Sequence, residues 1–363
     1  MPVVFVTILT AGINAFRHWL CIARIDALKG FLILSVVMCH VAGFCIGIQD
    51  DIPSFQPILF EFRNPPFFFV SGLFAYKAGT VWNGSHMASV IKKKFTAIAL
   101  PTTIFLLVLL YVHPSYNGRT FMHDSLEDVW FHWFTYALFV FFVFYAVIEF
   151  VLHLFRCNDT VKDIVLLGIG ALCYLLFSVP SVYDKLPFSI DVKQVLGMSY
   201  WGFFLFFVLG IMAKKHYTRF ERFLHHRWYM AACIVIFLLF NIFSTPLMAN
   251  HFNLFRIVTY LTGIILVFTF FKTYTLPNRI NKFLLVTGKR TLDIYLIHYF
   301  FLPLGLYYQA SIFRETPMPV IELLLTMSIS VIVIALSLLV SYVIRLSPVT
   351  AHFILGEKLT KNK

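Results

Sequence analysis

Long apolar runs constrain the fold of this chain more than any other feature of its sequence. A run of about 18 or more mostly apolar residues is long enough to cross a bilayer as a helix. Ten such runs occur, at residues 28–48, 57–78, 95–113, 129–155, 161–180, 194–213, 229–248, 254–272, 291–312 and 319–346. Lipid offers the backbone no hydrogen-bond partners, so runs of this length fold as helices. The sequence therefore predicts an all-α polytopic membrane protein, a bundle of about ten transmembrane helices.

Lysine and arginine residues are distributed unevenly over the loops between these runs. If the N-terminus is cytoplasmic, 23 of the 29 basic residues lie on the cytoplasmic side, five lie on the opposite side and Arg63 lies within a span. Because positive loops stay in the cytoplasm, this asymmetry predicts an integral membrane protein with both termini cytoplasmic. The net charge of +12 then reflects topology, and no nucleic-acid partner is expected.

The same patterns divide the chain into three parts. Residues 1–23 form an N-terminal extension that is apolar but short for a span, and we interpret it as peripheral or disordered. Residues 24–346 form the membrane unit, and residues 347–363 form a cytoplasmic tail. No loop is long enough for a soluble domain, so any chemistry belongs to the bundle.

The six cysteines have no metal-ligand or disulfide spacing, and no metal is expected.

Two ionisable residues frame the first apolar run. Lys29 and His40 are eleven residues apart, which places them on nearly the same helix face and about 16 Å apart along its axis. Ionisable groups at bilayer depth usually face a protein interior or a water-filled cavity, so His40 is a candidate functional residue. Asp26 lies one turn before the lysine. Two alternatives stay open: Lys29 as an orientation-setting, snorkelling lysine, and His40 as a structural histidine.

An arginine and a double proline interrupt the second run. Arg63 stands about 9 Å inside the outer end of this run, within several Å of the predicted depth of His40. Pro65 and Pro66 remove two backbone donors and break the helix, which is tolerated in a membrane only where the backbone lines a cavity. The arrangement indicates an anion-facing site. The structural alternative is an ion pair of Arg63 with Glu61.

A third polar group lies in the segment GKRTLDIYLIHYF, residues 288–300. His298 is about 10 Å inside the cytoplasmic end of the ninth run. Asp293, five residues earlier, points about 140° away from it, so the two side chains can reach one cavity only from different sides. His298 also has a structural alternative, a hydrogen bond between helices.

Five segments between residues 24 and 346 resemble, in order, the acyltransferase 3 family of ten-helix membrane acyltransferases. The first matches the family's pattern of a basic residue, ten residues and a histidine, here Lys29 and His40. The others are FRNPPFFFVSGLFA, WFTYALFVFF, WGFFLFFVLGIMAKK and the TLDIYLIH motif of residues 291–298. The paired arginines that the family often has near its third helix are replaced by Lys92, Lys93 and Lys94.

The resemblance implies an O-acyltransferase of a bacterial inner membrane. It would take an acyl group, most often acetyl, from cytoplasmic acyl-CoA and move it to a hydroxyl of a cell-envelope or exported glycan or of a lipid-linked sugar. Membrane lipid is the other expected partner. His40 would be the general base. Arg63 would stabilise the oxyanion or position an anionic acceptor. His298 would orient the acceptor or assist proton transfer.

The remaining candidates are donor-binding and positioning residues. The phosphates of acyl-CoA would lie at the basic cytoplasmic rim, where charge-assisted contacts hold them. The lysines at this rim are Lys29, Lys92, Lys93 and Lys94. The carboxylates that we expect to position the substrates are Asp26, Glu61 and Asp293.

A proton-coupled transporter or flippase is the alternative function from another class. His40, Arg63 and His298 would then line a proton and substrate pathway, and a proline-broken helix suits this function too. Against it, the sequence lacks the paired broken helices typical of inverted-repeat transporters. Labelled acetyl-CoA separates the two, since an enzyme labels glycan and a transporter does not.

Overall fold

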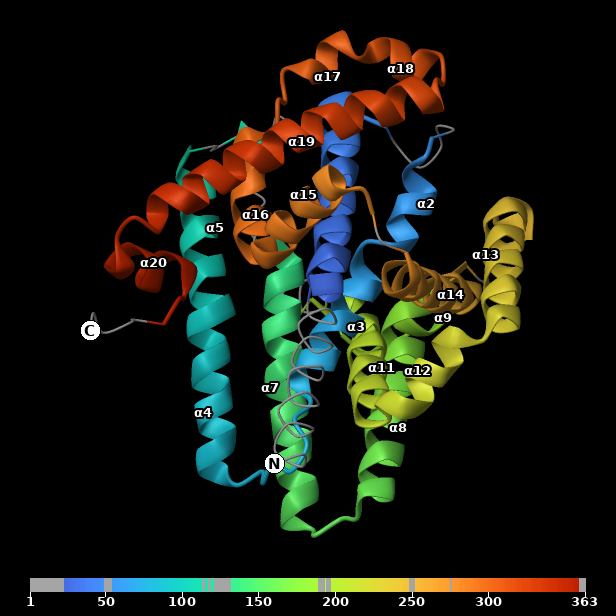
Figure 1. The fold of residues 1–363 in the computed structure, drawn as a ribbon, viewed down its shortest axis with the longest axis vertical. Coiled ribbons are helices and arrows are strands. Elements are labelled where there is room, and N and C mark those ends of the chain that lie inside the picture. Colours follow the sequence, from blue (N-terminus) through green and yellow to red (C-terminus); the bar gives the residue numbers. More distant parts are fainter. Residues whose placement is uncertain are drawn as a thin grey trace, which may run out of the picture.

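The computed structural model describes residues 23–48, 54–112, 115–116, 119–120, 132–188, 193, 197–247, 252–274 and 276–358. Residues 1–22 of the predicted N-terminal extension and residues 359–363 of the predicted tail lie outside the described residues. Within them, every element is helical except a hairpin of β1 (Ser115–Tyr116) and β2 (Arg119–Thr120) (Figure 1). The prediction of an all-α polytopic membrane protein is confirmed.

Six helices in the described part of the chain are long and apolar enough to span a membrane. They are Ala23–Ile46, Gly84–Val112, Trp133–Leu154, Asp159–Ser178, Arg256–Thr273 and Pro319–Ile344. A seventh is obtained when Tyr217–Leu224 and Trp228–Phe240, which meet at 74°, are counted as one bent span. The number of continuous spans is therefore below the predicted ten.

Three of the predicted spans are interrupted, which lowers the count. The second run consists of α2 (Gln56–Glu61) and α3 (Asn64–Ala75). The sixth contains the 3₁₀-helix η4 (Met198–Phe203) and α11 (Phe204–Lys215). The ninth contains α16 (Thr291–Ile297), the 3₁₀-helix η5 (His298–Phe301) and α17 (Leu306–Gln309). Most residues of α3, α11 and α16 are buried among other helices, so their short lengths and breaks face protein instead of lipid.

The other helices complete the bundle. The first span, Ala23–Ile46, ends in the π-helix η1 (Val41–Ile46). The span Gly84–Val112 consists of α4 (Gly84–Lys94), the π-helix η2 (Phe95–Ala99) and α5 (Leu100–Val112). The remaining elements are α7 (Trp133–Leu154), α8 (Asp159–Ser178), α9 (Pro180–Tyr183), α12 (Tyr217–His225), α13 (Arg227–Leu247), α14 (Phe252–Thr273), α15 (Asn278–Lys289), α18 (Ser311–Glu315), α19 (Pro319–Ile344) and α20 (Pro348–Leu355).

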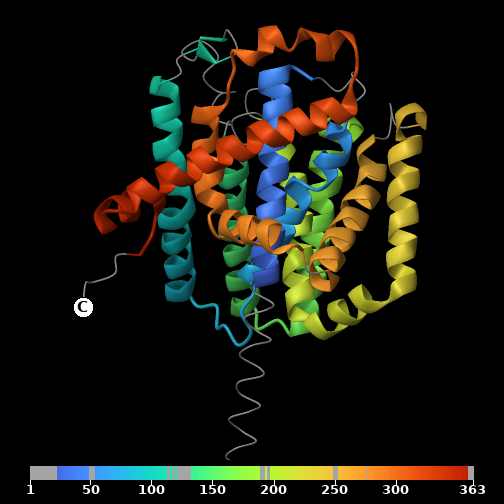
Figure 2. The same ribbon diagram turned by 45° about the horizontal axis from the view of Figure 1, so that its top comes forward.

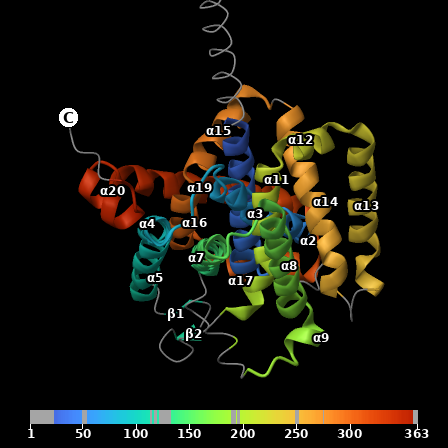
Figure 3. The same ribbon diagram turned by 90° about the horizontal axis from the view of Figure 1, so that it is seen from below.

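The first span lies at the centre of the bundle. Seen from below, α3, α7 and α16 lie around it, with α4, α5 and α20 on one side and α13 and α14 on the other (Figure 3). Helix α19 crosses the bundle obliquely (Figure 2). The most apolar part of the first span is 67% buried, compared with 28% for α19. The first span is therefore a core helix, and α19 lies at the periphery.

Two glycines bring α3 and α11 into backbone contact. A Cβ atom added to Gly72 would lie 1.9 Å from the carbonyl oxygen of Phe207, and one added to Gly210 would lie 2.0 Å from that of Phe69. Neither position has room for a side chain. This close contact holds α3, and with it the helix break at Arg63, against the phenylalanine-rich core of the bundle.

Replacing Gly72 with alanine is expected to destabilise the protein, because the added methyl group meets backbone atoms that cannot rotate away. Overpacking of this kind costs about 1–3 kcal/mol. The loss is measurable as a lower melting temperature of the detergent-solubilised protein. Gly168→Ala is the matched control, since nothing lies within 4 Å of a Cβ on Gly168. Equal melting temperatures of the two variants would contradict the backbone contact.

Candidate active site

Two histidine rings from distant parts of the chain meet inside the bundle. His40 Nδ1 lies 2.8 Å from His298 Nε2, and the rings are nearly parallel with their centroids 5.0 Å apart. His40 directly precedes the π-helix η1, and His298 begins the 3₁₀-helix η5. The α-helix thus gives way to a π-helix after His40 and to a 3₁₀-helix at His298. Turns of π-helix are frequent at functional sites.

The hydrogen bonds of the pair determine which nitrogen of each ring carries a proton. His298 Nδ1 lies 2.9 Å from the carbonyl oxygen of Ile294, which can only accept, so Nδ1 is the donor. In the neutral ring the Nε2 atom of His298 is then an acceptor, and His40 Nδ1 donates to it. A neutral His40 therefore has its lone pair on Nε2. This is the arrangement in which one group orients a histidine base.

Tyr299 and Arg63 lie close to this base. The Tyr299 hydroxyl is 3.5 Å from His40 Nε2. Arg63 stands in the turn between α2 and α3, close enough for its charge to act on Cys39, His40 and Tyr299. The structure thus brings His40, Arg63 and His298, the three candidate catalytic residues, into one cluster.

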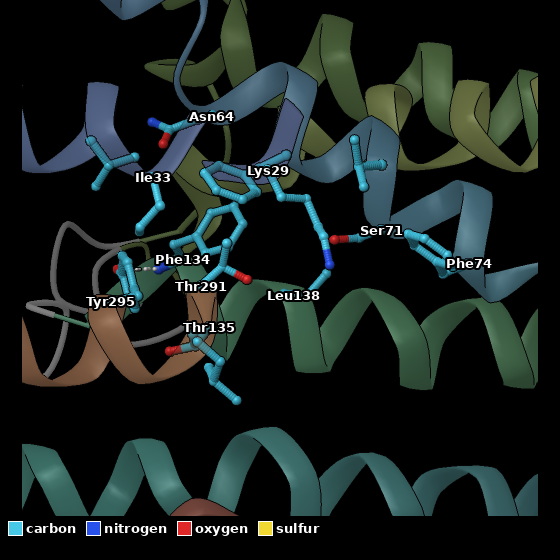
Figure 4. A pocket seen from close by; sticks show the side chains of 14 residues that line it. Lys29, Ile33, Asn64, Ser71, Phe74, Phe134, Thr135, Leu138, Thr291 and Tyr295 are labelled. Carbon is cyan, nitrogen blue, oxygen red and sulfur yellow. Dashed lines mark hydrogen bonds between the residues drawn. The ribbon is translucent and has the colours of Figure 1, made fainter. Parts of the chain in front are cut away.

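A cavity of about 140 Å³ follows the face of the first span that leads to His40. Lys29, Ile33 and Val36 line it, at the spacing of one helix face. Figure 4 shows the Lys29 side chain reaching between Ser71 of α3 and Leu138 of α7. Most of the remaining wall is apolar, so this cavity suits an extended, weakly polar chain better than a nucleotide.

The inner end of this cavity lies against the histidine cluster. Asn64, which lines it, is the next residue after Arg63. Tyr295 lines it too, and the centroid of the Tyr295 ring is 5.9 Å from that of His298. The cavity therefore connects the neighbourhood of Lys29 with the neighbourhood of His40 through Asn64 and Tyr295.

The other candidate lysines lie outside this cavity. Lys92 and Lys93 are exposed at the end of α4, and Lys94 Nζ lies 3.5 Å from the centre of the Phe142 ring. Lys29 is the lysine that lines the cavity, and its Nζ also pairs with Asp26 Oδ1 at 2.8 Å. Asp26 itself does not line the cavity.

Glu61 and Asp293 form ion pairs away from the histidine cluster. Glu61 accepts hydrogen bonds from Arg256 Nε at 3.3 Å and from the Thr259 hydroxyl at 2.7 Å. Asp293 lies 2.6 Å from Arg345 Nη1 and also accepts from the Ser341 hydroxyl. Neither carboxylate lines the cavity. Glu61 pairs with Arg256, whereas the sequence suggested Arg63.

Arg345 extends the Asp293 pair toward the C-terminal helix. Its Nε donates to Glu357 Oε1 at 2.8 Å, just beyond α20. Desolvation lowers the pKa of Arg345, but the hydrogen bond and charge of Asp293 outweigh it, so this pKa is raised above its usual value. A permanently charged Arg345 thus ties α16, which precedes His298, to α19 and α20.

His132 is a further histidine of the cluster that sequence reasoning missed. It is fully buried, and its Nε2 lies 3.3 Å from the Leu296 carbonyl oxygen. Its ring packs against those of Tyr295 and Tyr299, at centroid distances of 5.9 and 5.3 Å. The available signal was a histidine near the start of the apolar run of residues 129–155, which does not by itself separate His132 from other histidines near span ends.

The described residues contain no group of three or more histidine, cysteine or acidic side chains arranged to hold a metal ion. The chemistry of the cluster is that of imidazole, phenol and guanidinium groups. Such a set can accept a proton, donate hydrogen bonds and stabilise negative charge.

Comparison with known proteins gives one family. Residues 22–346 match the family model described as an acyltransferase domain of the acyltransferase 3 type. The matched range covers the first span, the helix break at Arg63, both histidines of the pair and α19. No curated protein and no solved structure matches the chain.

Proposed function

Since the chain belongs to the acyltransferase 3 family, we propose that it transfers an acyl group, most simply acetyl, from cytoplasmic acyl-CoA to a hydroxyl of a cell-envelope glycan. The observation that carries this proposal is the hydrogen-bonded pair of His40 and His298. It leaves the lone pair of a neutral His40 on Nε2, on the side of Tyr299 and within the field of Arg63.

The donor enters along the face of the first span. Its phosphates remain at the cytoplasmic rim beside Lys29, and its pantetheine arm extends into the 140 Å³ cavity past Ile33 and Val36. Lys29 and His40 are about 16 Å apart along the helix, a distance that an extended arm covers. The thioester then lies near the histidine pair.

The reaction is a direct transfer between two bound substrates. His40 Nε2 takes the proton of the acceptor hydroxyl while the hydroxyl oxygen attacks the thioester carbonyl carbon. Negative charge develops on the carbonyl oxygen, where the Arg63 guanidinium stabilises it. The carbon–sulfur bond then breaks, and the CoA thiolate takes the proton held by His40. The products are an acylated hydroxyl and free CoA.

Membranes that contain the protein, incubated with [¹⁴C]acetyl-CoA, test this function. We expect label in the glycan fraction, and no label there with membranes that lack the protein. Uptake of a sugar or another solute without glycan labelling would favour the transporter instead. Stable labelling of the protein itself would show a covalent acyl-enzyme and contradict direct transfer.

Lys29→Ala is expected to weaken the use of acyl-CoA. A partly exposed charge contact contributes about 1 kcal/mol, so the KM for acetyl-CoA should rise roughly three- to tenfold with little change in kcat. Lys358→Ala is the matched control, because this lysine is exposed, lies outside the cavity and is not a candidate for donor binding. An unchanged KM would indicate that Lys29 only orients the helix in the membrane.

A further inference from the structure

A second cavity, of about 320 Å³, lies at the other end of the bundle. Its wall includes Tyr174, Phe177 and Ser178, at the C-terminal end of α8. The N-terminal end of that helix, where Asp163 pairs with Lys215 at 2.7 Å, lies at the end of the bundle where the first span begins (Figure 1). This cavity therefore opens away from the rim that holds Lys29.

The lining of this cavity combines aromatic rings with polar groups. Tyr183, Phe203 and Tyr260 contribute aromatic rings, and Asp184 and Arg256 contribute charged groups. Small-molecule sites have volumes of about 300–1,000 Å³ and a few polar groups that fix orientation. Rings that stack on C–H faces, beside groups that bind hydroxyls, are suited to a sugar.

The two charged residues that line this cavity, Asp184 and Arg256, have opposite signs, which favours a ligand without net charge. Arg256 is paired with Glu61 at 3.3 Å. Lys193 Nζ, outside the lining, donates to the backbone carbonyl oxygen of Tyr183 at 2.8 Å. The lining residues thus give a phosphate or carboxylate no surplus of positive charge, and the further positive charge that acts on this site is that of Arg63.

The helix break at Arg63 connects the two cavities. On one side of the break, Asn64 lines the cavity that leads from Lys29. On the other side, Glu61 holds Arg256 of the second cavity, and the charge of Arg63 acts on Tyr260. The residues on either side of Arg63 in the chain therefore border the two cavities, Asn64 directly and Glu61 through its pair with Arg256.

We propose that the second cavity, lined by Tyr183, Phe203, Tyr260, Asp184 and Arg256, binds the neutral sugar ring of the acceptor and presents its hydroxyl toward Arg63 and His40. This inference rests on the proposed function, and it assigns the acceptor to a site separate from that of the donor. The two substrates then reach the same cluster from opposite ends of the bundle.

Protection from a thiol reagent tests the site without relying on turnover. Ser199 lines the cavity and is exposed, so Ser199→Cys should react with a membrane-impermeant maleimide. The probe is neutral polysaccharide purified from cells that express the protein. It should slow labelling of Ser199→Cys at least threefold. It should not slow labelling of Thr316→Cys, a matched exposed position that does not line the cavity.

A kinetic measurement supplements the protection experiment. Tyr183→Ala removes one ring from the cavity wall and should raise the KM for the same polysaccharide roughly fivefold or more, with the KM for acetyl-CoA unchanged. The melting temperature of the variant verifies that it is folded.

The outcomes separate this inference from the proposed function. Glycan labelling by the wild-type protein, without protection of Ser199→Cys, would overturn the sugar site and leave the acyltransferase intact. Protection without any glycan labelling would support the sugar site and overturn the proposed transfer. Protection of both cysteine positions would show nonspecific shielding and overturn the assignment to this cavity.

Discussion

His40→Ala is expected to lower acetyl transfer to glycan by roughly 10²- to 10⁴-fold, the usual contribution of a positioned general base. The substitution removes the nitrogen that takes the hydroxyl proton. The measurement is glycan labelling from [¹⁴C]acetyl-CoA in membranes, normalised to the amount of folded protein.

The controls for this variant address folding and the choice of histidine. Size-exclusion chromatography in detergent should show unchanged amounts of folded His40→Ala protein. His153→Ala, an exposed histidine in the last turn of α7, should retain wild-type transfer. Near-normal transfer by a folded His40→Ala protein would exclude His40 as the base.

His298→Leu is expected to lower the same transfer roughly 100-fold, since residues that orient an active group commonly contribute 10–100-fold. The leucine leaves His40 Nδ1 without the acceptor that it contacts at 2.8 Å. The His40 ring can then rotate or exchange tautomers, and its lone pair no longer stays on Nε2. His298 is a positioning residue in this mechanism, whereas the sequence suggested that it orients the acceptor or assists proton transfer.

A matched substitution distinguishes orientation of His40 from mere packing. The side-chain carbonyl of His298→Gln can accept the hydrogen bond from His40 Nδ1, so this variant should retain about tenfold more activity than His298→Leu. The KM for acetyl-CoA should be similar in both. Equal losses in the two variants, with both proteins folded, would argue that His298 only fills space.

The grouping of two candidate residues could be anticipated from the sequence. Helical rise predicted Arg63 within several Å of the level of His40, and the charge of Arg63 acts on His40 and on its neighbour Cys39. The spacing of Lys29 and His40 predicted one shared face, and the cavity follows that face. The depth of a residue in the membrane and the helix face on which it lies both depend on its position within its helix. That position can be counted from the local sequence.

The partners of the charged residues were not predictable in this way. Glu61 pairs with Arg256, 195 residues later, and Asp293 pairs with Arg345. Such pairs depend on how each helix is rotated and which helices are neighbours. A single sequence contains little information on either. His132 was missed for the same reason, because only packing against Tyr295 and Tyr299 distinguishes it from any other histidine at the end of a span.

By itself, the sequence determined that the chain is a polytopic helical membrane protein, because bilayer thickness and helical rise convert residue counts directly into distances. The tertiary structure decided that three apolar runs are broken, since neighbouring helices shield their backbones from lipid. It also decided that His298 contacts His40, across 258 residues. That contact assigns the lone pair of a neutral His40 to Nε2, and it exists only because the first span and α16 pack side by side.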